Sequence, residues 1–214
     1  MKDYFNITNE DNMELMKRFP DNYFDLAIVD PPYGIGAENH AGNAKNGWTQ
    51  WEKKEWDCNT PTAEYFTELK RVSKNQIIWG ANYMTEFLEP SMGWIVWDKG
   101  QRDFSLADGE LAWTSFNKAM RIFTFARAKA LQEGKIHPTQ KPIKLYEFCL
   151  SKYAKEGDKI LDTHLGSGSI AIAIDNMNKI EKMNLTLTAC ELDKSYYDTA
   201  IKRINNKTKQ ECLF

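Results

Sequence analysis

The sequence lacks any long apolar run. Its uninterrupted apolar stretches are short, such as residues 170–174 (IAIAI), whereas a helix that crosses a bilayer needs about 20 apolar residues. The N-terminal residues MKDYFNITNED contain no apolar signal-peptide region either. We therefore expect no membrane partner and a cytoplasmic location, in a bacterium or a phage-infected host.

Cysteine and histidine are scarce and scattered. The four cysteines, Cys58, Cys149, Cys190 and Cys212, form no C-x-x-C pair, and the three histidines have no zinc-ligand spacing. This pattern argues against a structural zinc, any other metal site and a disulfide framework. Reduced, mostly buried thiols fit a cytosolic compartment.

Neither sign of charge dominates the chain. The formal net charge is −2 and the pI is about 6.0, which argues against a protein that coats nucleic acid non-specifically. One segment differs, because residues 117–144 hold seven Lys or Arg side chains and a single acidic one. That segment is either a local nucleic-acid face or an ordinary solvated face.

Length and composition fit one globular domain. The 214 residues, 42% hydrophobic and 27% charged, are enough for a substantial core. Strand-like and helix-like segments alternate, which predicts a mainly parallel α/β sheet with helices on both faces. The expected strands are residues 3–8, 24–30, 75–80, 93–99, 110–115, 121–126, 159–165 and 185–191, and the expected helices are residues 11–19, 62–72, 142–153, 169–177 and 195–204. The strands at 110–115 and 121–126 could pair as a hairpin. We predict a single domain over residues 1–214, with loop insertions at about 34–60 and 100–136.

A glycine-rich turn joins the strand at 159–165 to the helix at 169–177. Residues 166–171 (GSGSIA) fit the pattern G-x-G-x-x-A, and Glu191 lies 20 residues further on, at the end of the next strand. Glycines let the backbone turn sharply and approach a ligand closely, and an acid at that distance can accept both hydroxyls of a ribose. The turn thus indicates a cofactor that contains adenosine, NAD included, or only a tight strand-to-helix connection. Asp162, just before the turn, favours a ligand with an ammonium group over a pyrophosphate.

A second motif, Asp30-Pro31-Pro32-Tyr33, follows the strand at 24–30. Because the carboxyl ends of parallel strands form the ligand crevice of such a sheet, Asp30 is expected to point into that crevice. The two prolines fix successive φ angles and so hold the main-chain carbonyls and the Tyr33 ring rigidly. A carboxylate, a carbonyl and an aromatic face together suit the exocyclic amino group of a flipped base. The alternative is a Pro-Pro turn closed by an aspartate.

The motifs together resemble those of amino-group DNA methyltransferases, which modify adenine N6 or cytosine N4. FPDNYFDLAIVDPPYGIG resembles their catalytic motif, HPTQKP (residues 137–142) the segment before their cofactor half, and DTHLGSGSIAIA (residues 162–173) their S-adenosylmethionine loop. The catalytic motif precedes the cofactor loop, as in the permuted, beta-type members. The resemblance spans nearly the whole chain. It implies a Rossmann-like, S-adenosylmethionine-dependent methyltransferase fold with a circularly permuted motif order and a mostly parallel, seven-stranded sheet.

The resemblance also implies roles for particular residues. The target-base pocket would be formed by Asp30, Pro31, Pro32 and Tyr33. The cofactor would be held by Asp11, Asp162, Gly166, Ser167, Gly168, Glu191, Thr139 and Lys141. Of these, Asp11 would lie near the adenine, Glu191 at the ribose hydroxyls, and Thr139 and Lys141 near the carboxylate. The chain departs from the family pattern at three positions, where Glu10, Thr163 and His164 replace Gly, Pro and Phe.

The implied reaction is direct methyl transfer to the amino nitrogen of a base in double-stranded DNA. It needs no covalent enzyme intermediate, and the chain has no Pro-Cys dipeptide, the nucleophile motif of the cytosine-C5 enzymes. By resemblance D-P-P-Y favours adenine N6, with cytosine N4 as the alternative. Other classes stay open: an NAD(P)-dependent oxidoreductase, a non-enzymatic DNA-binding module, or a methyltransferase that acts on RNA or on protein glutamine.

The chain has no room for a large insert that would recognise the target DNA sequence. We expect recognition from residues 34–59, where Trp48 and Trp51 would stack on a base or pin the loop to the body, and from the basic residues 117–144. The C-terminal Gln210, Leu213 and Phe214 resemble the Q-x-x-L-F peptide that docks into bacterial sliding clamps. The alternative is that Leu213 and Phe214 pack on their own domain. The sequence also leaves open a homodimer and a companion restriction enzyme.

Overall fold

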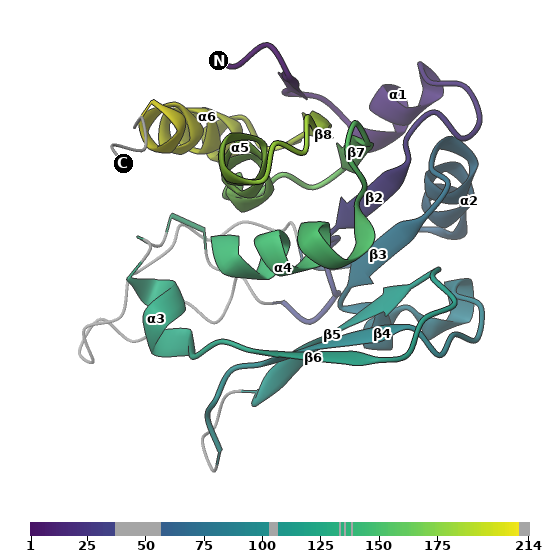
Figure 1. The fold of residues 1–214 in the computed structure, drawn as a ribbon. Helices are drawn as coiled ribbons and strands as arrows, with labels where there is room; N and C mark the ends of the chain where they lie inside the picture. Colours follow the sequence, from purple (N-terminus) through teal and green to yellow (C-terminus); the bar gives the residue numbers. More distant parts are fainter. Residues whose placement is uncertain (37–56, 103–106, 133, 135, 138, 210–214) are drawn as a thin grey trace.

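A single sheet runs through the part of the chain that the computed structural model describes, which is residues 1–36, 57–102, 107–132, 134, 136–137 and 139–209 (Figure 1). The sheet has eight strands in the order β1-β8-β7-β2-β3-β5-β4-β6. They are β1 (Phe5–Thr8), β2 (Leu26–Val29), β3 (Gln76–Trp79), β4 (Trp94–Asp98), β5 (Gly109–Thr114), β6 (Arg121–Thr124), β7 (Lys159–Asp162) and β8 (Thr186–Cys190). Neighbouring strands are parallel except where β5 pairs with β3 and with β4.

Helices cover both faces of this sheet (Figure 1). The helices are α1 (Asn12–Lys17), α2 (Ala63–Val72), α3 (Arg127–Leu131), α4 (Ile143–Tyr153), α5 (Ser169–Ile180) and α6 (Lys194–Thr208), with short 3-10 turns at Ala81–Tyr83 and Thr85–Phe87. Side chains of α1 and α2 build one hydrophobic cluster, and those of α4, α5 and α6 build the other. The predicted three-layer α/β architecture is therefore confirmed.

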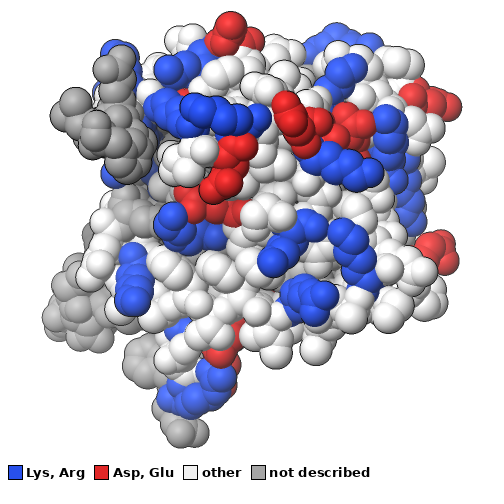
Figure 2. Space-filling model, in the orientation of Figure 1, with Lys and Arg blue, Asp and Glu red and all other residues white. Residues whose placement is uncertain are grey.

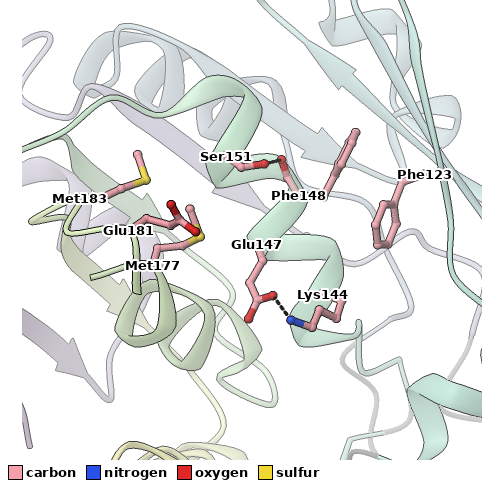
Figure 3. Close-up of a pocket in the computed structure, with 8 residues that line it drawn as sticks. All are labelled: Phe123, Lys144, Glu147, Phe148, Ser151, Met177, Glu181 and Met183. Carbon is pink, nitrogen blue, oxygen red and sulfur yellow. Dashed lines mark hydrogen bonds and ion pairs between the residues drawn. The ribbon is translucent and has the colours of Figure 1, made fainter. Parts of the chain in front are cut away.

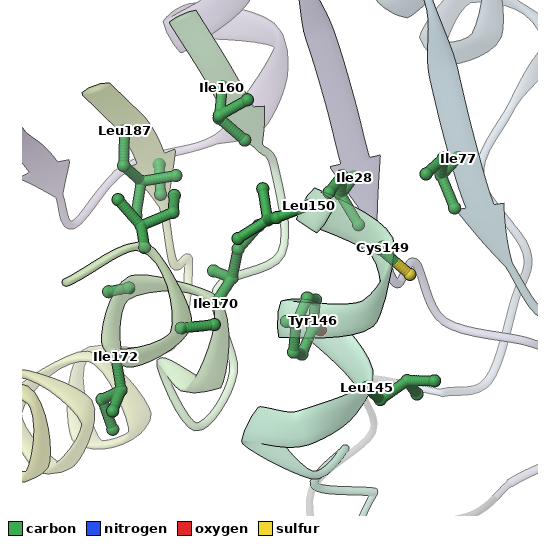
Figure 4. Close-up of a cluster of buried hydrophobic side chains, with 14 of the residues drawn as sticks. Ile28, Ile77, Leu145, Tyr146, Cys149, Leu150, Ile160, Ile170, Ile172 and Leu187 are labelled. Carbon is green, nitrogen blue, oxygen red and sulfur yellow. The ribbon is translucent and has the colours of Figure 1, made fainter. Parts of the chain in front are cut away.

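Strand β2 shows why the central strands are apolar throughout. Leu26 and Ile28 belong to the cluster under α4 and α5, where Figure 4 shows Ile28, whereas Ala27 and Val29 belong to the cluster under α1 and α2. All four side chains are at most 1% exposed, because alternate residues of a strand point to opposite faces and both faces are covered. A continuous apolar run thus marks a strand in the middle of the sheet.

Two details of the predicted topology are wrong. The sheet has eight strands instead of the seven that the resemblance implies, although all eight segments expected from the sequence form strands. Strands β5 and β6 do not form a hairpin, because β4 lies between them and pairs antiparallel with β5 and parallel with β6. Part of the predicted insertion at 100–136 is therefore regular structure, including the unpredicted helix α3.

Several predictions fall on residues outside the described ranges. These are the tryptophans Trp48 and Trp51 in the long loop, and the C-terminal Gln210, Leu213 and Phe214. The homodimer also stays a prediction. Within the described residues, every helix is too short or too polar to traverse a lipid bilayer.

Candidate active site

The two sequence motifs follow neighbouring strands at the centre of the sheet. Strands β2 and β7 are parallel partners, with Leu26 opposite Ile160 and Ala27 opposite Leu161. From this pair the chain proceeds outward in opposite directions, from β2 to β3 and from β7 to β8. Such a point, where the strand order reverses, leaves a crevice at the carboxyl ends of the strands. Asp30 directly follows β2, so it stands at this crevice beside the end of β7.

One cavity of about 950 Å³ connects the two motifs. Its wall includes Asp30 and Pro32 from the first motif, Gly166 and Ser167 from the glycine turn, and Glu191 beyond β8. The segment before α4 contributes His137, Thr139, Gln140 and Lys141. Of the predicted target-base residues, Asp30 and Pro32 line this cavity and Pro31 and Tyr33 do not. Of the predicted cofactor residues, five line it (Thr139, Lys141, Gly166, Ser167 and Glu191) and three do not (Asp11, Asp162 and Gly168).

The Asp30 motif is held by hydrogen bonds at both ends. The Tyr33 hydroxyl donates to Asp30 Oδ1 at 2.7 Å. The main-chain N–H groups of Tyr33 and Gly34 donate to Oδ1 of the buried Asp57, at 2.5 and 2.9 Å. The Tyr33 ring also stacks on Tyr83, with ring centroids 5.4 Å apart. Asp57 is a residue that the sequence analysis missed, since nothing in its local pattern connects it to a motif 24 residues upstream.

Lys141 lies at Asp30. Its ammonium is 2.5 Å from Asp30 Oδ1 and 3.3 Å from Glu110 Oε2, and it donates to the Tyr33 hydroxyl at 2.9 Å. The side chain is only 1% exposed. Burial disfavours the charged ammonium, but the carboxylates of Asp30 and Glu110 outweigh it and raise the pKa of Lys141. The resemblance implies a place for Lys141 near the cofactor carboxylate; in the structure its ammonium lies at Asp30 and Glu110.

The glycine turn after β7 adopts a backbone that suits glycine. Gly166 and Gly168 have φ angles of +52° and +73°, a region that other residues reach only with strain. A Cβ at Gly168 would also lie 2.7 Å from the side chain of Ile204 on α6. The turn is tied to the other motifs, because Ser169 Oγ donates to the main-chain carbonyl of Lys141 at 2.8 Å. Close packing therefore accounts for Gly168, while the Gly166 backbone faces the cavity.

Glu191 lines the cavity next to the glycine turn. Its Oε2 accepts the Gly166 N–H at 2.9 Å, and its Oε1 accepts the Asp193 N–H at 2.9 Å. Burial raises the pKa of this carboxyl group, and the backbone N–H groups partly offset that rise. A carboxylate so fixed is a rigid acceptor for ligand hydroxyls.

Asp11 lies at the start of α1, beside the cavity. It is the N-cap of α1, where Oδ1 accepts the N–H groups of Met13 and Glu14 at 2.8 and 3.3 Å. The residues around it, Glu10, Asn12 and Met13, line the cavity, and Asp11 itself does not. Capping a helix explains an aspartate at this position without a ligand.

His164 is a cavity residue to which the sequence gave no role. Its Nε2 is 3.1 Å from Asn12 Nδ2, which must donate, so that Nδ1 carries the proton and faces Thr163 Oγ1 at 2.9 Å. Thr163 Oγ1 in turn is 2.7 Å from the buried Tyr65 hydroxyl. Burial lowers the pKa of His164 to about 4, so the ring is neutral near pH 7. The two substitutions relative to the family pattern thus form one hydrogen-bonded unit in the cavity floor.

Asp162 ends β7 in an apolar environment. It is 1% exposed, and its Oδ1 accepts the His164 N–H at 3.0 Å. Burial, reinforced by the charges of Asp30 and Glu191, raises the pKa of Asp162 to about 8. Among the described residues no cation forms an ion pair with it. The charge of Lys141 lowers the pKa of Asp162 but does not offset the rise.

The raised pKa of Asp162 predicts a pH-dependent stability. The folded protein binds the Asp162 proton more tightly than the unfolded chain does, so this contribution to stability is lost as the pH rises towards the folded pKa of about 8. We expect the free energy of unfolding to fall by about 2 kcal/mol between pH 6.5 and pH 8. His164, with its pKa of about 4, acts in the opposite direction only below about pH 6.5.

Urea unfolding at several pH values in that window measures the effect. The Asp162→Asn variant keeps an oxygen for the His164 N–H but cannot titrate, so its stability should change much less with pH. Equal slopes for the two proteins would contradict the prediction.

Two surface features lie away from this cavity. An open groove of about 610 Å³ between β6, α4 and α5 is lined by Phe123, Phe148, Met177 and Met183, among others (Figure 3), and contains none of the predicted site residues. On the face that Figure 2 draws, Lys and Arg side chains lie in separate groups. Lys118 donates to the carbonyl of Lys152, at the end of α4 remote from Lys141. Only part of the basic segment therefore borders the cavity.

Known DNA methyltransferases resemble this chain in sequence. The sequence profile of the N6/N4 methyltransferases, described as "DNA methylase", matches residues 78–202. The chain belongs to the N6/N4 DNA methylase family. Similar curated proteins include the type II methyltransferase M2.MboI of Moraxella bovis, at 27% identity over 97% of this chain and 92% of that protein. The type II methyltransferase M.HpaI of Haemophilus parainfluenzae is 24% identical over 91% of this chain and 72% of that protein.

Solved structures share the fold of this methylase. The M1.HpyAVI–SAM complex superimposes with a TM-score of 0.60 at 20% identity, covering 94% of this chain and 99% of that one. The cytosine-N4-specific PvuII DNA methyltransferase gives a TM-score of 0.59 at 13% identity, covering 96% of this chain and 93% of that one. The predicted family, Rossmann-like fold and S-adenosylmethionine-dependent DNA methylation are confirmed. The family modifies both adenine and cytosine, so membership alone leaves the base open.

Proposed function

We propose that this methylase transfers a methyl group from S-adenosylmethionine to adenine N6 of a base flipped out of double-stranded DNA. The observation that carries the proposal is the shared cavity, in which Asp30 and the glycine turn at Gly166 line the same space. A methyl donor at the turn and an amine at Asp30 would then meet inside one enclosed volume. The D-P-P-Y motif supports adenine as the base.

The residues of the cavity fit the cofactor group by group. Glu191 offers a fixed carboxylate for ribose hydroxyls, and the Gly166 backbone leaves room for close approach. Asp162 does not line the cavity itself, but it lies just before the glycine turn as a buried carboxyl group without an ion-pair partner among the described residues, which suits the ammonium of a methionine moiety. Ser167 and Thr139 supply hydroxyl groups to the same wall.

Asp30 and Tyr33 would position the amine. When bound, S-adenosylmethionine supplies an electrophilic methyl group on a positively charged sulfur. Asp30 accepts an N–H of the amino group, which directs the nitrogen lone pair towards that methyl carbon. The new N–C bond forms as the C–S bond breaks, its electron pair goes to sulfur, and the nitrogen then loses a proton to Asp30 or to water. Such catalysis depends on positioning and fixed charges.

A labelled-methyl assay tests the proposal. The full chain is incubated with S-adenosylmethionine that carries a deuterated methyl group and with unmethylated duplex DNA, RNA or protein extract. Mass spectrometry of the hydrolysed products should then find labelled N6-methyladenine from DNA. N4-methylcytosine alone would refute the choice of base, and label only in RNA or in protein glutamine would refute the choice of substrate.

A further inference from the structure

Four charged side chains form a continuous series from Lys99, just after β4, to Asp30. Lys99 Nζ lies 2.7 Å from Glu110 Oε1, Glu110 Oε2 lies 3.3 Å from Lys141 Nζ, and Lys141 Nζ lies 2.5 Å from Asp30 Oδ1. The charges alternate in sign, so the chain of residues is neutral as a whole. Glu110 is in β5, Lys99 directly follows β4, and Lys141 precedes α4, so only the folded sheet assembles them.

The two oxygens of Asp30 differ. Oδ1 receives both the Lys141 ammonium and the Tyr33 hydroxyl, and the Lys141–Tyr33 hydrogen bond of 2.9 Å closes a triangle around it. Oδ2 has no hydrogen-bond partner among the described residues, and Asp30 lines the cavity. Because one oxygen is anchored at two points, the carboxylate cannot rotate freely and the other oxygen is presented to a ligand.

We propose that Lys141 and Glu110 are positioning residues for methyl transfer, with Lys141 locking Oδ1 so that Oδ2 accepts the amino group, and Glu110 sharing the Lys141 charge. This inference rests on the proposed function, since it assigns an amine to Asp30. It adds two residues from outside the D-P-P-Y motif to the machinery of the same site.

Glu110 matters because a Lys141 ammonium that paired with Asp30 alone would weaken Asp30 as a hydrogen-bond acceptor. A fully engaged ammonium neutralises the carboxylate that must polarise the amine. Burial and the Glu110 charge raise the pKa of Asp30, while Lys141 lowers it. Glu110 itself stays ionised, because Lys141 and Lys99 outweigh burial and lower its pKa. The pair therefore adjusts both the direction and the basicity of Asp30.

Three variants test the inference: Lys141→Met, Glu110→Gln and the double variant, which removes both charges and keeps the site balanced. Lys152→Met, an exposed lysine at the far end of α4, serves as the matched control. We expect Lys141→Met to lower kcat by about a hundredfold, as for loss of one preorganised donor, while the Kd for S-adenosylmethionine changes less than about twofold. Lys141→Arg should recover part of the loss, because it keeps the positive charge.

The pH profile separates positioning from a merely structural role. The proposal requires Asp30 as a carboxylate, so the part of the acid limb of kcat that Asp30 contributes should move to higher pH in Lys141→Met and to lower pH in Glu110→Gln. Asp162, a buried carboxyl group coupled to Asp30, is present in every variant. The double variant should lose less activity than the product of the single losses, because the two residues act as one unit. A Lys141→Met protein with the kcat and pH profile of the wild type would overturn the inference.

A carbon-13 NMR titration of the Asp30 carboxyl group keeps the test independent of activity. The Asp30 pKa should rise in Lys141→Met and fall in Glu110→Gln relative to the wild type, and an unchanged titration in both would overturn the inference. If the wild-type protein methylates no amine at all, the proposed function fails. The titration then still decides whether Lys141 and Glu110 control Asp30.

Discussion

Replacing Asp30 with alanine is expected to reduce methyl transfer at least about a hundredfold and to leave S-adenosylmethionine binding nearly unchanged. The substitution removes the acceptor that would align the amine and leaves the Lys141 ammonium with Glu110 and the Tyr33 hydroxyl as partners. The cofactor wall at Gly166 and Glu191 makes no hydrogen bond to Asp30, so it should keep its shape. Single-turnover kinetics and calorimetric titration measure the two quantities separately.

The matched control for this variant is Asp198→Ala. Asp198 is an exposed carboxylate of α6 that pairs with Lys194 on the surface, so its loss should not change the rate. A fully active Asp30→Ala protein would refute the assignment of the D-P-P-Y motif. A protein that no longer binds the cofactor would show that Asp30 belongs to the cofactor site instead.

Replacing Gly80 with alanine should damage the same pocket through Tyr33. A Cβ at position 80 would lie 2.0 Å from Tyr33 Cε1 and 2.3 Å from Cδ1, so the ring would have to move, which would disturb the hydrogen bond from its hydroxyl to Asp30. Gly80 also has a φ of +67°, which an alanine adopts only at a cost of about 1–2 kcal/mol. With overpacking of about 1–3 kcal/mol added, we expect a loss of stability of about 2–4 kcal/mol and a tenfold or greater loss of kcat.

The Gly157→Ala variant separates the effect of the steric clash with Tyr33 from the effect of backbone strain. Gly157 has a similar φ of +81°, but no atom lies within 4 Å of its expected Cβ. This control should lose only about 1–2 kcal/mol and keep its rate of methyl transfer. Denaturant unfolding and kcat are measured on both variants, and equal effects would show that the contact with Tyr33 is unimportant.

Local patterns predicted the elements of the fold well and their pairing less well. The apolar run LAIV predicts a central strand, because only a strand covered on both faces has no polar position. The order of β4, β5 and β6 was not predictable in this way. The short segment between β5 and β6 suggested a hairpin, but β4, which precedes both in the chain, lies between them in the sheet.

The residues of the candidate site likewise divide into those that local sequence patterns predicted and those that they did not. The motifs at Asp30 and Gly166 were visible in the sequence, since turn chemistry and strand ends are local features. Asp57, Glu110 and His164 were not, because each acts through a contact with a residue far away in the chain or through burial that no local pattern reports.

The sequence by itself determined the α/β class, the two motifs and their order, because alternating apolar segments, prolines and glycines restrict the backbone locally. Only the tertiary structure decided that both motifs open into one cavity and that the Lys141 charge lies at Asp30. Pairing of β2 with β7 brings together residues more than a hundred positions apart. The pKa values of the site residues depend on burial, which exists only once the layers are assembled.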